Sequence, residues 1–185
     1  MNKIELDVNK IREKLSATDI KLGTYRYIMD AVHKTDVSTD SRFQHEYKSF
    51  YGMHQYTDAD FCKVYFEYME ANKTGGINFE NVIIHLYHGT SGVQPSFSSK
   101  LLHTVNPDMP ILDSRVKYHL KLKTIPYYFP RVLRYYEEFV EIFSEYLTTQ
   151  NAADVIGVFD DIFGDTELTA VKKIDNAIWS LGKAK

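Results

Sequence analysis

The sequence predicts an all-α fold, because apolar residues recur at helical spacing along nearly the whole chain. Almost no segment shows the alternation of apolar and polar residues that is typical of a half-buried strand. Glycines and prolines lie where one periodic stretch gives way to the next. Because 185 residues suit one folding unit, we predict a compact single all-α domain over residues 1–185, with about eight or nine helices.

The first two helices are predicted around residues 4–15 and 22–32, where apolar residues recur every three or four positions. Residues 35–56 are polar and aromatic without a clear period, so we predict a loop there that holds at most a short helix. Thr57 and Asp60 have the spacing of a capping box and predict the start of the next helix. Its apolar face contains Phe61, Val64, Tyr65, Tyr68 and Met69, and Gly75-Gly76 ends it.

Two consecutive helices joined by a short glycine-containing connection are predicted in the middle of the chain. Asn78 is a suitable N-cap for a helix from about Phe79 to His88, which Gly89 and Gly92 close. Pro95 fits the first turn of the next helix, and Asn106-Pro107 stops it. We therefore predict a helix-hairpin-helix-like element at about residues 79–106.

Four more helices are predicted between residue 111 and the C-terminus. Ile111 and Leu112 form a short buried anchor, after which Asp113 caps a helix that turns Val116 and Leu120 inward. The clearest periodicity follows Pro130 and runs from residue 132 to 146, and a shorter helix is predicted at 152–163. Thr166 is predicted to start the last helix. The residues that this helix should bury are Leu168, Val171, Ile174, Ile178 and Trp179.

Composition excludes several classes of protein. The single cysteine, Cys62, rules out a disulfide framework, a four-cysteine zinc site and a four-thiolate iron–sulfur cluster. His85 and His88 have no acid within the same turn to complete a metal site, so we expect no metal there. We also expect no cofactor. No apolar run approaches the ~20 residues that a membrane helix needs, and the charged N-terminus is unlike a signal peptide. We therefore expect a cytoplasmic protein without a membrane contact.

The charges are unevenly distributed although the net charge is only −3. Residues 100–134 contain seven bases and two acids, whereas residues 135–165 contain eight acids and no base. Both runs have an ordinary interpretation as solvated helix surfaces. The basic run also suits nucleic acid, and the acidic face at 137–165 suits a basic protein partner.

Residues 92–120 contain the best candidate for chemistry. Two helices joined by a tight hairpin bring backbone N–H groups to one point, which favours a phosphate. An aspartate at the N-cap of the following helix is held by backbone donors and kept ionised. Asp113 could therefore stabilise a developing positive charge or orient a water, although it could also serve only as a cap.

These residues read GVQPSFSSKLL from Gly92 and MPILDSRVKYHL from Met109. They resemble the helix-hairpin-helix DNA glycosylases, most nearly the adenine-glycosylase and endonuclease III branch. The resemblance covers 29 of the 185 residues, and Pro110, Asp113 and Val116 match the pattern in register.

The resemblance implies a DNA-binding enzyme of base excision repair with Asp113 as its catalytic carboxylate. It implies a phosphate-binding hairpin at Gly92, Val93 and the following amides, which include Gln94 and Ser96. Because Ser96 stands where bifunctional members have a lysine, we expect a monofunctional DNA N-glycosylase. The expected contacts to the DNA backbone are Lys100, Arg115, Lys117 and Lys121.

The chain also departs from the family pattern. Gln94 replaces the second hairpin glycine, and the family's cysteine cluster is absent. Together with the acidic net charge, Gln94 favours an alternative, in which the same fold is a non-catalytic module that binds nucleic acid or a protein. The sequence predicts no particular oligomeric state.

Overall fold

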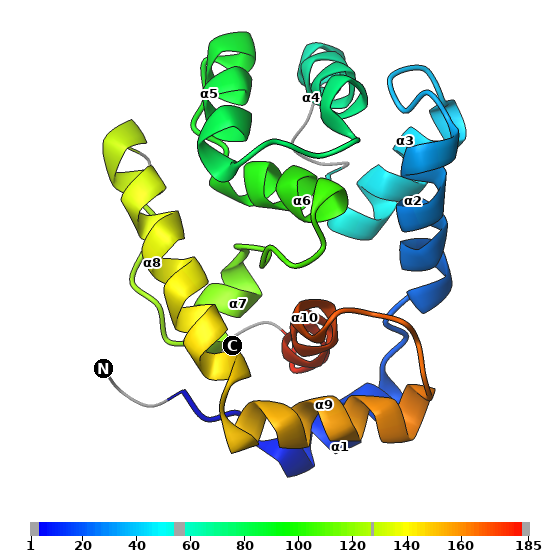
Figure 1. The fold of residues 1–185 in the computed structure, drawn as a ribbon, viewed down its shortest axis with the longest axis vertical. Coiled ribbons are helices and arrows are strands. Elements are labelled where there is room, and N and C mark those ends of the chain that lie inside the picture. The colour runs from blue at the N-terminus through cyan, green and yellow to red at the C-terminus, as the bar shows by residue number, and fades with distance from the viewer. Residues whose placement is uncertain (1–3, 54–57, 127, 183–185) are drawn as a thin grey trace. The chain divides into compact units, whose positions relative to one another are not determined.

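A computed structural model describes residues 4–53, 58–126 and 128–182, and in these ranges all regular structure is helical. The all-α class is therefore confirmed. The described residues form ten helices, α1 to α10 (Figure 1). None of the ten has both the length and the apolar character needed to cross a membrane.

The chain divides into two compact units. We call residues 1–20 and 107–185 the terminal unit, and residues 21–106 the middle unit. The single domain over residues 1–185 stays a prediction.

The terminal unit is built around its last helix. It contains α1 (Val8–Ala17), α7 (Ser114–His119), α8 (Phe129–Leu147), α9 (Gln150–Phe163) and α10 (Ala170–Ser180). α10 packs against α1, α7 and α9, and most of its residues are buried. Two of them are charged: Lys172 Nζ lies 2.6 Å from Asp175 Oδ2, so that each buried charge has a partner of opposite sign.

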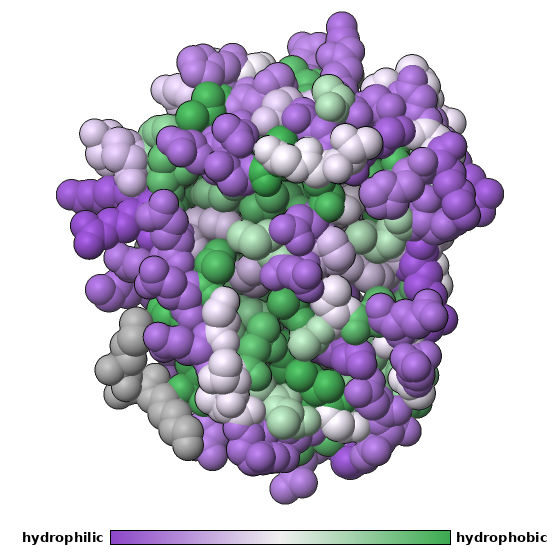
Figure 2. All heavy atoms as spheres, in the orientation of Figure 1, coloured by the Kyte–Doolittle hydropathy of each residue, from purple (hydrophilic) through white to green (hydrophobic). Residues whose placement is uncertain are grey.

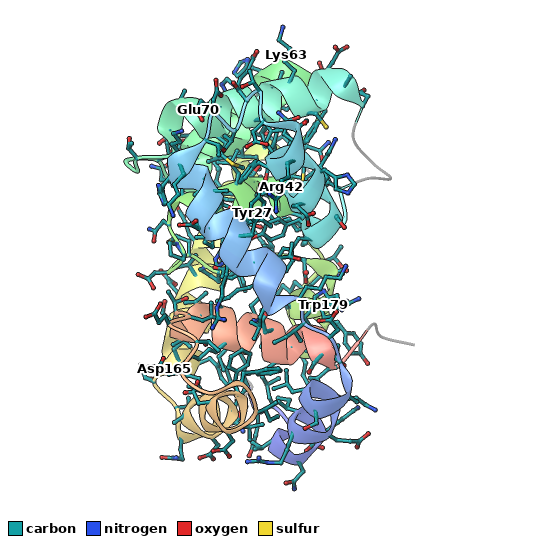
Figure 3. All side chains as sticks on the ribbon, turned by 90° about the vertical axis from the view of Figure 1, so that its right-hand side faces the viewer. Tyr27, Arg42, Lys63, Glu70, Asp165 and Trp179 are labelled. Atoms are coloured by element: carbon teal, nitrogen blue, oxygen red, sulfur yellow. The ribbon has the colours of Figure 1, made fainter. Side chains whose placement is uncertain are left out.

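The middle unit is rich in aromatic contacts. It contains α2 (Leu22–Lys34), α3 (Ser41–Tyr51), α4 (Ala59–Asn72), α5 (Phe79–Thr90) and α6 (Pro95–Val105). α6 packs against α2, α4 and α5. Arg42 of α3 lies 4.7 Å above the ring of Tyr27 of α2 (Figure 3).

A buried polar network joins three helices of the middle unit. The Tyr47 hydroxyl lies 2.9 Å from the Tyr65 hydroxyl and 3.2 Å from Thr104 Oγ1. Tyr65 also donates to the carbonyl oxygen of Phe97. Burial raises the pKa of both phenols well above the usual value. Because every hydroxyl here has a partner, the polar atoms are buried without a large cost.

Several predicted boundaries are confirmed. The Asn78 side chain accepts from the Asn81 amide, and the Asn81 side chain accepts from the Asn78 amide, which completes a capping box at α5. Pro95 is the first residue of α6, and Asn106 ends that helix. Asp113 is the N-cap of α7, and Val116 in this helix and Leu120 at its C-terminal end are both buried.

The region predicted as a loop contains an eleven-residue helix, α3. Its buried residues Phe43, Tyr47 and Tyr51 recur every four positions, which is a helical spacing that the surrounding polar residues obscure. α4 begins after Asp58, whose side chain accepts from the Phe61 amide at 2.7 Å. Thr57, the predicted first residue of that helix, lies outside the described residues.

The predicted end of α5 is wrong in one respect. Gly89 lies inside the helix, and the left-handed residue that closes it is Ser91, with φ of 55°. A Cβ at Gly89 would lie 2.5 Å from Cγ1 of Val64. The glycine is therefore needed because α4 and α5 approach closely, and not because it ends the helix.

The last helix also differs from the prediction. Thr169, rather than Thr166, is the N-cap of α10 and accepts from the Lys172 amide. Val171, Ile174 and Ile178 are buried as predicted, but Trp179 is 38% exposed. Trp179 follows Ile178 directly, so a turn of about 100° carries its side chain away from the buried stripe.

Candidate functional site

Asp113 is held firmly at the start of α7. Its Oδ1 accepts hydrogen bonds from the amides of Arg115 and Val116, both at 2.9 Å. The residue is half-buried. Two N–H donors and the helix dipole favour the charged carboxylate, so the terminal unit presents a fixed anion at this point.

The segment that leads into Asp113 is anchored at two carbonyl groups. The Tyr136 hydroxyl donates to the carbonyl oxygen of Pro110 at 2.9 Å, and the Thr169 hydroxyl donates to that of Pro107 at 3.1 Å. Ile111 and Leu112 are buried. Residues 107–112 are thus fixed by α8, by the start of α10 and by burial, and this fixes where α7 begins.

The predicted hairpin lies in the middle unit as a four-residue connection, 91–94, between α5 and α6. Gln94 is the N-cap of α6, and its carbonyl oxygen accepts from the amide and the hydroxyl of Ser98. Its side-chain Nε2 lies 2.9 Å from the position that a Cβ of Gly92 would take. The Gln94 side chain therefore folds back over Gly92, at the position where the resembling family has a second glycine.

Two other predicted residues lie on α6. The Ser96 carbonyl oxygen accepts from the Ser99 hydroxyl at 2.9 Å. Lys100 Nζ donates to the Tyr51 carbonyl oxygen at 3.1 Å and lies 5.2 Å from the ring centre of Phe97. The Lys100 ammonium therefore has partners inside the middle unit.

Arg115 makes a double contact with Trp179. Its guanidinium carbon lies 4.1 Å from the centre of the indole ring, and its Nη1 donates to the Trp179 carbonyl oxygen at 2.9 Å. Trp179 lies at the C-terminal end of α10 (Figure 3). A cation above an aromatic face at this distance is a favourable arrangement.

α7 carries a second exposed ring between basic residues. Because Val116 and Leu120 face inward, helical geometry places Tyr118 on the opposite side, where it is 54% exposed. In the sequence, Lys117 directly precedes Tyr118, and Arg115 and Lys121 lie three residues before and after it. The sequence analysis missed Tyr118 and Trp179 as functional candidates, although a helical wheel centred on Val116 and Leu120 would have found Tyr118.

The predicted site residues fall into two sets. Asp113, Arg115, Lys117 and Lys121 lie together on α7 and directly after it, in the terminal unit. The middle unit holds the remaining set, which is Gly92, Val93, Gln94, Ser96 and Lys100.

A cavity of about 560 Å³ lies within the terminal unit. It is lined by residues 4–5, by residues 119–123 at and after the end of α7, by Thr149, and by six residues of α8, which are Tyr135, Glu138, Phe139, Ile142, Glu145 and Tyr146. The Tyr135 hydroxyl donates to the Lys123 carbonyl oxygen at 2.7 Å, and burial raises the pKa of Tyr135 to about 12. Asp113 is not among the lining residues of this cavity.

The acidic run forms exposed faces of α8 and α9. Figure 2 shows hydrophilic residues along the outer side of α8. Three of its acids form ion pairs: Glu138 with Arg134 at 3.3 Å, Asp161 with Arg12 at 2.8 Å, and Asp160 with Lys173 at 2.7 Å. The basic protein partner expected at this face stays a prediction.

Among the described residues, no three or more histidine, cysteine, aspartate or glutamate side chains gather as metal ligands would. Comparison of the chain with protein-family models, with curated proteins and with solved structures finds no significant match.

Proposed function

We propose that the chain is a divergent helix-hairpin-helix DNA glycosylase-like protein that hydrolyses the N-glycosidic bond of a flipped base. The observation that carries this proposal is the Asp113 carboxylate, whose Oδ1 is fixed by two amides at 2.9 Å. The carboxylate stands at the start of a stretch, 114–136, that contains six bases and no acid. A carboxylate that is followed in the chain by several cations suits a reaction on a polyanionic strand.

The reaction needs a fixed negative charge. As the bond between C1′ and the base breaks, the base leaves with the electron pair and positive charge develops on the sugar. A carboxylate that is already oriented stabilises this charge without reorganising. The oxygen of a water then bonds to C1′, the water loses a proton, and the base gains one. Asp113 is assigned to stabilise the sugar or to orient this water.

Each unit supplies its own expected contact to nucleic acid. On the middle unit the amides after Gly92 are assigned to a phosphate, and on the terminal unit Arg115, Lys117 and Lys121 are assigned to the backbone. A target base inside a duplex must leave the stack before its glycosidic bond can be reached. We therefore expect mismatched or damaged pairs, which open most easily, to be the preferred substrates.

The test is a count of abasic sites after incubation with duplexes that carry damaged or mismatched bases. The variant Asp113→Asn keeps a side-chain oxygen as the cap of α7 but removes the negative charge. The proposal predicts abasic sites with the wild-type protein and a background level with the variant. Equal background levels for both proteins across a broad panel would contradict catalysis.

A second candidate function is a non-catalytic module that binds nucleic acid. Two observations favour it: Gln94 covers Gly92 in the hairpin, and Asp113 does not line the cavity of the terminal unit. In this case both proteins should bind nucleic acid equally, with affinity that falls steeply as salt is added, and neither should release a base. Binding without abasic sites therefore separates this candidate from the first.

A further inference from the structure

The terminal unit exposes two aromatic rings next to basic side chains. Tyr118 is 54% exposed on α7, and Trp179 is 38% exposed on α10, which packs against α7. We call the surface formed by Arg115, Lys117, Tyr118, Lys121 and Trp179 the α7/α10 surface. Neither ring belongs to the hairpin or to the carboxylate of the proposed function.

Arg115 holds Trp179 in place. The guanidinium lies on the indole ring and also donates to the backbone carbonyl of the same residue, so both groups are fixed together. An ordered ring loses little further conformational freedom when a ligand stacks on it. The arrangement of a cation, an ordered indole and an exposed tyrosine is the kind found where proteins bind unpaired bases.

The charges around the two rings suit a polyanion. Arg115, Lys117 and Lys121 are the basic residues of the α7/α10 surface, and the stretch 114–136 contains six bases and no acid. Nucleic acid would use both kinds of group, because its phosphates pair with basic side chains and its bases stack on aromatic rings. The two exposed rings therefore favour nucleic acid with unpaired bases, because bases inside a duplex have no free face for stacking.

We propose that the α7/α10 surface binds an unpaired stretch of nucleic acid, with bases stacked on Tyr118 and Trp179 and phosphates near Lys117 and Lys121. This goes beyond the proposed function, because it needs neither the hairpin nor hydrolysis by Asp113. The substitution Asp113→Asn removes a negative charge and should therefore not weaken this binding, whereas it should abolish hydrolysis, so that a loss of catalysis and a loss of stacking are distinguishable.

The chain itself supplies the probe, because Trp179 is its only tryptophan. The experiment follows the fluorescence of Trp179 while the full chain is titrated with a thymidine or a uridine oligonucleotide, and separately with heparin, which has charges but no bases. We expect saturable quenching by at least one of the oligonucleotides and none by heparin. The two oligonucleotides show whether DNA or RNA is preferred.

The matched variants are Tyr118→Ala and Tyr87→Ala, which each remove one exposed tyrosine, the first on the α7/α10 surface and the second on α5. Tyr118→Ala removes the partner of one stacked base and should weaken oligonucleotide binding about tenfold. Tyr87→Ala should bind the oligonucleotide as tightly as the wild type. Arg115→Lys, which keeps the charge but removes the planar group above Trp179, should also weaken binding. Circular dichroism checks that all variants are folded.

Two results would overturn the proposal. One is the absence of quenching by both oligonucleotides at low salt. The other is binding that is equally tight for wild type, Tyr118→Ala and Arg115→Lys, since charge alone would then account for it.

Discussion

The hydroxyl of Tyr136 donates a hydrogen bond of 2.9 Å to the carbonyl oxygen of Pro110, three residues before Asp113. This bond connects the middle of α8 to the segment that positions the candidate carboxylate. Tyr136 is 2% exposed, so neither the donor nor its ring is accessible to water. The contribution of this hydrogen bond to stability can therefore be measured by removing the hydroxyl oxygen of Tyr136.

We predict that Tyr136→Phe lowers the free energy of unfolding by about 1 to 3 kcal/mol, because a buried carbonyl group loses its partner. The measurement is urea unfolding followed by circular dichroism and by the fluorescence of Trp179. As the control, Tyr118→Phe removes a hydroxyl from an exposed ring and should change stability by less than about 0.5 kcal/mol. If Tyr136→Phe also changed the free energy of unfolding by less than about 0.5 kcal/mol, the hydrogen bond to Pro110 would not anchor the segment before Asp113.

Tyr136 should also make the stability of the protein fall in alkaline solution. Burial raises the pKa of Tyr136 well above the value of 10 for an unfolded tyrosine. Above pH 10 the unfolded chain therefore releases this proton more readily than the folded chain, and stability falls as pH rises. Tyr136→Phe has no such proton, so its unfolding free energy should fall less steeply over this range than that of the wild type.

Two substitutions of Asp113 separate its capping role from its charge. Asp113→Ala removes the acceptor of two amide bonds and should cost about 1 kcal/mol, whereas Asp113→Asn should cost only a few tenths. Thermal or urea unfolding measures both. If the alanine variant were as stable as the asparagine variant, the two hydrogen bonds at the start of α7 would not matter for the fold.

Gly89 and Gly157 are both inside helices, yet alanine should have opposite effects at the two positions. At Gly89 a Cβ would lie 2.5 Å from Cγ1 of Val64, so Gly89→Ala should destabilise the protein by about 1 to 3 kcal/mol. At Gly157 a Cβ would meet no atom within 4 Å, so Gly157→Ala should stabilise it by about 0.5 to 1 kcal/mol.

The cause at Gly89 can be checked with a double variant. Adding Val64→Ala to Gly89→Ala removes the two methyl groups that the new Cβ would contact, so the double variant should regain part of the lost stability. A double variant that loses the sum of both single effects would show that the close approach of α4 and α5 is not the reason for the glycine.

Local signals in the sequence predicted the helix boundaries best. Asn78 and Asp113 are caps because their short polar side chains accept hydrogen bonds from amides two or three residues later in the chain. This depends only on neighbouring residues. The helix α3 was predicted only as a possible short helix within a loop. Phe43, Tyr47 and Tyr51 recur every four positions, but Phe50 and several polar residues interrupt the pattern.

Features that depend on tertiary contacts were not predictable in the same way. Gly89 looked like a helix end, but its role depends on Val64 of another helix. Trp179 looked like a core residue, and its contact with Arg115 of α7 depends on how α7 packs against α10. The sequence therefore predicted where Asp113 lies and what fixes it, but not the aromatic residues that accompany its basic neighbours.

The central claim is that the basic stretch after Asp113 contacts the backbone of nucleic acid. Its most direct test is the dissociation constant for a DNA oligonucleotide measured over a range of salt concentrations, with wild type and with Lys117→Ala/Lys121→Ala. We predict binding by the wild type, and for the variant weaker binding whose logarithmic salt slope is smaller by about 2. No binding at low salt, or identical slopes for the two proteins, would contradict the claim.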